Sequence, residues 1–111
     1  MPSYWIARSR ILDPERYGAY ARAAGLAGQN AVISPQILAR GGQHRILEGS
    51  LDFERNVLLK FPRFEDAVLF YYSSAYQDAA ALRRNGAGIN ELVVTEGIDE
   101  QPCIGPDGHA V

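Results

Sequence analysis

The chain has 111 residues, of which 47% are hydrophobic and 22% are charged, and its formal net charge at pH 7 is −2. This length is that of one ordinary domain, and the composition is that of a folded globular protein and not of a disordered chain. The small negative charge excludes the strongly basic surface that attracts nucleic acid or anionic lipid, so we expect neither nucleic-acid nor membrane partners.

No targeting signal and no metal or cofactor motif is visible in the sequence. The N-terminal residues lack the charged start and apolar core of a signal peptide. No apolar run approaches the roughly 20 residues that a membrane-spanning helix needs. The single cysteine, Cys103, excludes an internal disulfide and favours a reducing compartment, so we expect a cytoplasmic protein. Cys-x-x-Cys, His-x-x-x-His and glycine-rich phosphate-loop patterns are all missing, so we expect no metal and no cofactor.

The first elements are a strand and a helix. Residues 3–11 are rich in aromatic and β-branched types, which predicts a strand. Asp13 then offers a good N-cap and Pro14 suits the first helical position, so a helix starts here. Its apolar residues, Tyr20 among them, recur at spacings of three and four, and we expect it to end before Pro35.

The middle of the chain predicts two more strands. Residues 36–49 predict a long second strand that is bent at Gly41 and Gly42, where a bulge is the expected use of glycine. Residues 50–54 predict a turn, and residues 55–61 predict the third strand.

A second helix and a fourth strand follow. The helix is expected to begin near Pro62 and to be interrupted at Ser73, and residues 89–97 predict the last strand. We therefore expect one domain over residues 1–97, followed by a C-terminal tail over residues 98–111 with little regular structure, because Gly, Pro and Asp are frequent there.

The predicted order is β-α-β-β-α-β, an α+β chain. Two βαβ units with right-handed crossovers give a ferredoxin-like fold, in which a four-stranded antiparallel sheet carries two helices on one face. In the third strand Val57 and Leu59 lie on one side and Leu58 on the other, so the face without helices is also apolar. We expect a second copy of the chain to cover that face, giving a homodimer built as a dimeric α/β barrel.

The sequence contains several short motifs, namely YWIAR (4–8), LARGG (38–42), LEG (47–49), FYYSSAYQ (70–77) and VVTEG (93–97). Together they resemble the domain-of-unknown-function 1330 family, which belongs to the dimeric α/β-barrel superfamily. The chain departs from the family pattern at Phe70, where tryptophan is usual, and at Ser74-Ala75, where Pro-Glu is usual. The resemblance implies the same fold and dimer, with a pocket between sheet and helices. It implies no particular reaction, because this family has no settled activity.

Arg40, Gly41 and Gly42 are candidate ligand-binding residues. The arginine side chain can offer a bidentate fork to a carboxylate or phosphate, and the adjacent glycines let a ligand approach the backbone. The alternative is a structural salt bridge from Arg40, either to an acidic residue of its own fold such as Glu48 or across the dimer.

Phenols and one histidine are the other candidates. Tyr20 is a candidate ligand-binding residue, whereas Tyr71 and Tyr76 match the family motif and are candidate catalytic residues. The alternative is that each ring packs in the core with its hydroxyl at the rim. His44 is a candidate general base, and the alternative is an exposed or interface strand residue. His109 lies in the predicted tail and is expected to take no part.

The sequence leaves two functions open. The first is a small cofactor-independent enzyme that acts on a small polar or aromatic molecule in a pocket between helices and sheet. The second is a non-catalytic homodimer, which either binds a small anionic or aromatic ligand or has only a structural role. An enzyme needs at least two convergent polar groups with room for a substrate beside them, so the positions of Arg40 and the tyrosines around a cavity decide between these functions.

Overall fold

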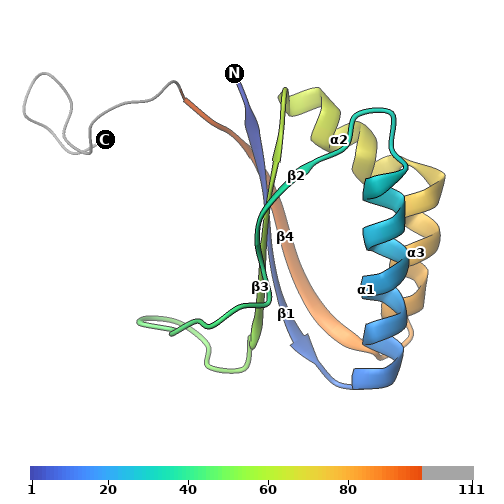
Figure 1. The fold of residues 1–111 in the computed structure, drawn as a ribbon. Helices are drawn as coiled ribbons and strands as arrows, with labels where there is room; N and C mark the ends of the chain where they lie inside the picture. The colour runs from blue at the N-terminus through green and yellow to red at the C-terminus, as the bar shows by residue number, and fades with distance from the viewer. Residues whose placement is uncertain (99–111) are drawn as a thin grey trace, which may run out of the picture.

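The computed structural model of the protein describes residues 1–98. Its elements in chain order are β1 (Ser3–Ile11), α1 (Pro14–Gln29), β2 (Gln36–Arg40), β3 (Arg55–Phe61), α2 (Phe64–Tyr72), α3 (Ser74–Arg84) and β4 (Gly88–Glu96). The strands form one antiparallel sheet in the order β2-β3-β1-β4, and the helices lie together on one face of it (Figure 1). The predicted α+β, ferredoxin-like fold is therefore confirmed. Cys103, His109 and nearly all of the predicted tail lie outside the described residues.

The helix boundaries follow from capping residues. The Asp13 side chain accepts a hydrogen bond from the backbone N–H of Arg16 at 3.2 Å, and Pro14 opens α1. The Ser73 hydroxyl donates to the Phe70 carbonyl at 2.7 Å and accepts from the Tyr76 N–H at 3.2 Å. One serine thus ends α2 and caps α3, so the predicted second helix is in fact two helices. Neither these helices nor α1 is long and apolar enough to cross a membrane.

The predicted second strand is wrong in its length and in its bulge. The β2 strand contains five residues, its bulge lies between Ile37 and Ala39, and residues 41–54 form a loop. A strand of the predicted length has no partner, because β3 supplies only seven residues. Gly41 ends β2 with a φ of +65°, a conformation that favours glycine, and its N–H donates to the Asn56 carbonyl at 2.9 Å.

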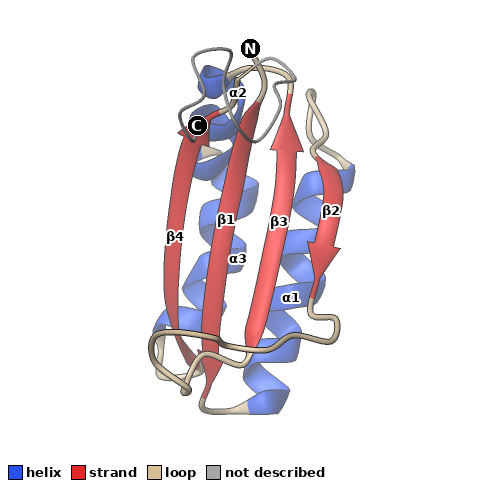
Figure 2. Cartoon of the chain, turned by 90° about the vertical axis from the view of Figure 1, so that its left-hand side faces the viewer, coloured by secondary structure: helices blue, strands red, loops and turns tan. Residues whose placement is uncertain are grey.

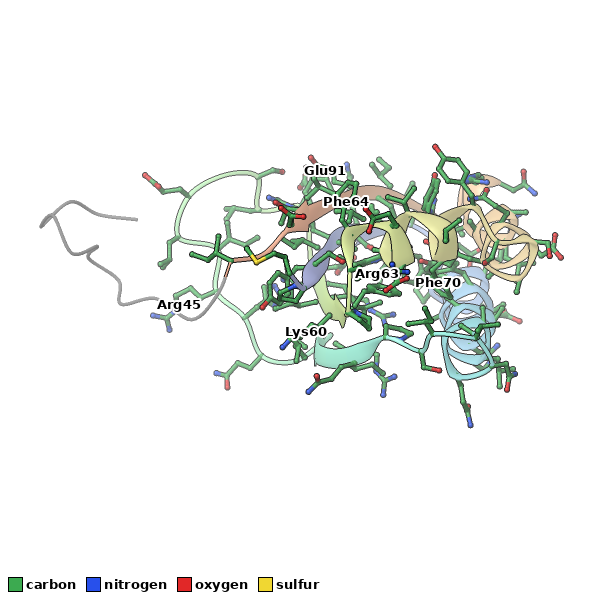
Figure 3. All side chains as sticks on the ribbon, turned by 90° about the horizontal axis from the view of Figure 1, so that it is seen from above. Arg45, Lys60, Arg63, Phe64, Phe70 and Glu91 are labelled. Carbon is green, nitrogen blue, oxygen red and sulfur yellow. The ribbon has the colours of Figure 1, made fainter. Side chains whose placement is uncertain are left out.

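The loop after β2 lies on the side of the sheet that carries no helix. In Figure 1 it extends away from the three helices, and Figure 2 shows it crossing in front of the sheet. Seen from above, Arg45 of this loop lies on the opposite side of the sheet from Phe70 and the helix layer (Figure 3). His44 is therefore an exposed loop residue and not a strand residue.

The hydrophobic core lies between the sheet and α2–α3, around the single tryptophan. Trp5 is 3% exposed, and its ring centroid is 5.0 Å from that of Tyr76, 5.6 Å from Phe70 and 6.2 Å from Phe61. The α1 helix packs mainly against α3, and its backbone lies farther from the strands, which it reaches through long side chains such as Tyr17. The half of the sheet that faces α1 is consequently less tightly covered than the half that faces α2.

The other face of the sheet carries an apolar row at its centre. In the strand register Ile6 lies opposite Leu58 on one side and opposite Val93 on the other. The Ile6 side chain is 42% exposed and Val93 is 56% exposed. Charged residues flank the row, among them an ion pair between Arg8 and Glu91 at 3.7 Å. No helix covers this face (Figure 2), as the sequence predicts, and the loop after β2 crosses only part of it, near Arg8.

Candidate functional site

A cavity of about 860 Å³ lies between α1 and the β1, β3 and β2 strands, and we call it the helix–sheet cavity. Small-molecule sites in proteins usually measure about 300–1,000 Å³. Small residues on the inner face of α1 leave the space open, since larger side chains there would reach the sheet. The apolar and small lining consists of Trp5, Ala7, Ala21, Ala24, Gly25, Leu26, Gly28, Pro35, Ile37, Val57, Leu59 and Phe70.

Arginine side chains supply the charge of this cavity. Arg40 pairs with Val57 in the strand register, and Arg55 precedes Val57 by two residues, so both arginines belong to the helix-facing side of the sheet. Arg22 lines the cavity from α1, and no carboxylate is among its lining residues in the described part of the chain. Arg40 forms no ion pair within residues 1–98, so the predicted alternative of a salt bridge to Glu48 is not found there.

Arg55 is held in place without a partner of opposite charge. Its Nε is buried and has no hydrogen-bond partner among residues 1–98, and its guanidinium carbon lies 5.6 Å from the centroid of the Tyr17 ring. The Tyr17 hydroxyl is itself 2.6 Å from the Ser9 hydroxyl, so it is already satisfied. A buried donor that has no acceptor is rare in folded proteins, and it marks a position where a ligand atom can be bound.

Tyr20 and Tyr76 form a pair of hydroxyl groups on the wall of the cavity. Their oxygens are 2.9 Å apart, and Nη2 of Arg83 donates to the Tyr76 hydroxyl at 3.4 Å. Burial raises the pKa of Tyr20, because it disfavours the phenolate, and the neighbouring Tyr76 raises it further. Tyr20 is therefore neutral at physiological pH and can donate a hydrogen bond, but it is a poor base.

The remaining residues predicted for the site do not line this cavity. Tyr71 faces a second, smaller cavity, and its hydroxyl accepts from Nη2 of Arg84 at 3.4 Å. His44 is exposed, with Nδ1 3.4 Å from the Gly42 carbonyl oxygen. Gly41 and Gly42 follow the last strand residue of β2 and are likewise absent from the lining. The structure thus brings together Arg40, Tyr20 and Tyr76, whereas the site roles of the other residues stay predictions.

Several polar residues of the cavity were missed from the sequence, Arg22 of α1 among them, and for two of them, Arg55 and Asn90, the sequence held a signal. In a strand every second side chain lies on the same face, so Arg55 shares a face with Val57 and Leu59. The sequence therefore already indicated an arginine on the core-facing side of the third strand. Asn90 alternates with Leu92 in the same way on β4, and its Oδ1 is buried without a partner. A polar residue at a core position of a strand was the available signal in both cases.

The family follows from comparison with known proteins. A family model described as "Domain of unknown function (DUF1330)" matches residues 2–98. The chain belongs to this family. The resemblance seen in the sequence motifs is therefore confirmed, and the family as a whole has no known function. Among curated proteins, no significant match to this DUF1330 protein is found.

Solved structures with the same fold include enzymes of different kinds. The hydroxynitrile lyase of Passiflora edulis has a TM-score of 0.67 and 13% identity, over 91% of this chain and 97% of that chain. SnoaB, a cofactor-independent oxygenase from Streptomyces nogalater, has a TM-score of 0.60 and 12% identity over the same shares. A dimeric protein of unknown function and ferredoxin-like fold from Bacteroides fragilis has a TM-score of 0.54 and 14% identity, over 86% and 96%. At these identities the likeness of the DUF1330 protein to them shows the fold alone.

Proposed function

We propose that this DUF1330 protein binds a small organic anion with an apolar body in the helix–sheet cavity. The observation that carries this proposal is the charge of the lining, because Arg22, Arg40 and Arg55 occur there and no described lining residue is a carboxylate. The guanidinium groups bind the carboxylate or other oxyanion of the ligand. Its hydrocarbon or aromatic part packs against the apolar wall around Trp5.

The unpartnered Nε of Arg55 sets the expected strength of this contact. A hydrogen bond to a charged group contributes about 1.5–3 kcal/mol, and a ligand oxygen at this position also relieves a buried donor that otherwise has no acceptor. Losing this hydrogen bond corresponds to a fall in affinity of about tenfold to a hundredfold. We therefore expect Arg55→Gln to weaken anion binding by that amount and to leave the fold intact.

Trp5 provides the assay, since it is the only tryptophan of the chain and lines the cavity. Its fluorescence is followed during titration with benzoate and hexanoate, and with the uncharged analogues benzyl alcohol and hexanol. We expect saturable binding of at least one carboxylate and much weaker binding of its uncharged analogue. Arg45→Gln, an exposed loop substitution outside the cavity, is the matched control for Arg55→Gln. Equal binding of each carboxylate and its analogue, or no binding at all, would contradict the proposal.

A cofactor-independent enzyme is the second candidate function, and the Tyr20–Tyr76–Arg83 cluster favours it. A neutral Tyr20 can donate a hydrogen bond to an oxygen that gains negative charge during a reaction, with Tyr76 and Arg83 supporting it. SnoaB is an enzyme of this cofactor-independent kind by name. In this reading Arg40 binds the anionic group of the substrate. The catalytic roles predicted for His44 and Tyr71 remain predictions, and the cluster does not depend on them.

Solvent-exchange measurements separate the two candidates. If the cluster stabilises an enolate, solvent hydroxide removes a C–H proton next to the carbonyl of the bound ligand, forming water and the enolate, and D₂O then returns a deuteron to that carbon. We expect Tyr20→Phe to remove that exchange while the affinity measured by Trp5 fluorescence stays nearly the same. Binding without any exchange, in the parent protein as well as in the variant, would leave the protein a non-catalytic binding protein.

We also propose that the protein acts as a homodimer through the face of the sheet that carries no helix. The apolar row around Ile6 supports this, since a second copy would remove it from water. The loop on that side adds Leu47 at 84% exposure and Leu51 at 79%. The protein from Bacteroides fragilis is dimeric by name. We expect the dimer to work in the cytoplasm, in line with the single cysteine.

A further inference from the structure

A second cavity of about 450 Å³ lies between α2, α3 and β4. It shares one lining residue, Asn90, with the helix–sheet cavity. Its lining consists of Val68, Tyr71, Tyr72, Arg83, Arg84, Asn90, Leu92 and Val94. Two arginines, Arg83 and Arg84, therefore line this cavity, and none of its described lining residues carries a negative charge.

Arg83 is the half-buried cation of this second cavity. Its Nη2 makes a long hydrogen bond of 3.4 Å to the Tyr76 hydroxyl, and its guanidinium carbon lies 5.1 Å from the centroid of the Tyr20 ring. Its Nε is buried and has no hydrogen-bond partner in the described part of the chain. Burial lowers the pKa of Arg83, but the interactions with Tyr76 and Tyr20 outweigh burial and raise it, so the group stays charged. Within residues 1–98 no carboxylate forms an ion pair with this charge, so a bound anion would add the opposite charge that the described residues do not supply.

The position of Arg83 in α3 does not account for these features. Arg83 and Arg84 lie in the last turn of the helix, where positive charge is favoured by the helix dipole. However, Arg83 reaches back seven residues to Tyr76, and within residues 1–98 it forms neither an ion pair nor a hydrogen bond to a helix carbonyl. The dipole of α3 accounts for a positive charge at this position, but it does not account for a buried Nε that has no acceptor among the described residues.

Further polar groups around Arg83 suit an oxyanion. Arg84 is exposed, and its Nη1 is bound to the Gln77 side chain at 3.0 Å, which fixes a second positive charge at the mouth of the cavity. The side-chain oxygen of Asn90 is buried without a partner, and a half-turn of its amide would present the NH₂ group instead. We propose that this second cavity binds a small oxyanion, a carboxylate or a phosphate, with Arg83 as its principal ligand.

The site is tested by NMR on the full chain, with the Nε–H resonance of Arg83 as the probe. Sodium acetate and inorganic phosphate are titrated separately, with sodium chloride adjusted to keep the ionic strength constant. We expect a saturable shift with at least one of them, and the anion that saturates at lower concentration identifies the source as a carboxylate or a phosphate. A shift that does not saturate, or that is equal at the exposed Arg16, would overturn the proposal.

Substitutions make the assignment specific. Arg83→Lys keeps the charge and loses the planar fork, so we expect the affinity for the anion, followed in this variant and in the parent protein at the side-chain amide resonances of Asn90, to fall about tenfold. Arg16→Lys, on the exposed side of α1, should leave the affinity unchanged. An unchanged affinity in Arg83→Lys would refute the role of Arg83. Should that variant fail to fold, the titration of the parent protein still decides the question.

The second site also differs from the proposed ligand site in its response to Arg55→Gln. That substitution alters the helix–sheet cavity and should leave the titration at Arg83 within about twofold of the parent protein, because Arg55 does not line the second cavity. Loss of the Arg83 response in Arg55→Gln would show one continuous site and overturn this inference. Failure of organic anions to change Trp5 fluorescence would instead contradict only the proposed function.

Discussion

Replacing Gly41 by alanine should destabilise the protein, whereas the same change at Gly42 should not. Gly41 has a φ of +65°, and holding a side chain in that left-handed conformation costs roughly 1–2 kcal/mol. The added Cβ would lie 3.6 Å from Nε of Arg55, which is an ordinary contact, so strain of the backbone accounts for the whole effect. Gly42 has no atom within 4 Å of an added Cβ and no positive φ. Its substitution should change the free energy of unfolding by less than about 0.5 kcal/mol.

Urea denaturation measures both variants under the same conditions. We expect the midpoint of Gly41→Ala to fall at an unchanged slope, because the surface exposed on unfolding stays the same. For a domain near this size, about 1 kcal/mol corresponds to a drop in melting temperature of roughly 4–8 °C. Equal destabilisation by both alanines would refute the reasoning. So would a stable Gly41→Ala, since the turn at the end of β2 would then not require glycine.

Three other substitutions and one deletion test the dimer, the buried phenol, the anion site and the tail. Ile6→Asp should dissociate or unfold the homodimer in sedimentation, since an unpaired charge is costly in an apolar interface, and a folded monomer of the parent protein would contradict this. The raised pKa of Tyr20 means that folding stability falls as the pH rises above about 10, and Tyr20→Phe should flatten that decline in a melting series. Deletion after Gly97 should preserve the dimer and most of the melting temperature. Arg40→Lys should weaken a bound anion by roughly 1–3 kcal/mol in the fluorescence titration and barely change stability.

Local signals in the sequence predicted most of the fold. Asp13 and Pro14 set the start of α1, and Ser73 set the break between α2 and α3, because capping chemistry depends on a few adjacent residues. The end of β2 was predicted wrongly since it depends on β3, a partner elsewhere in the chain, and on how many of its residues are free to pair. The length of a strand depends on both of the segments that pair, so the composition of one segment cannot predict it.

The site was predicted only in part for a similar reason. Arg40 and Tyr76 face the helix–sheet cavity as the sequence indicated, but Tyr71, five residues before Tyr76, faces the second cavity. The break at Ser73 lies between these tyrosines, so a single helical period does not relate them. The presence and volume of the helix–sheet cavity depend on the distance between α1 and the sheet. The residue pattern of α1 does not predict that distance.

The packing of α1 against α3 also bears on how this protein moves. The α1 helix rests on α3 and reaches the core through a few side chains, Tyr20, Ala24 and Ala27, so it can tilt about α3 once those contacts open. Local opening requires less free energy where few apolar contacts must break. Backbone amides of α1 should therefore exchange with deuterated solvent faster than those of α3, and a ligand bridging α1 and the strands should slow that exchange. The proposed binding site would then be bounded on one side by α1, a helix that opens more readily than α3.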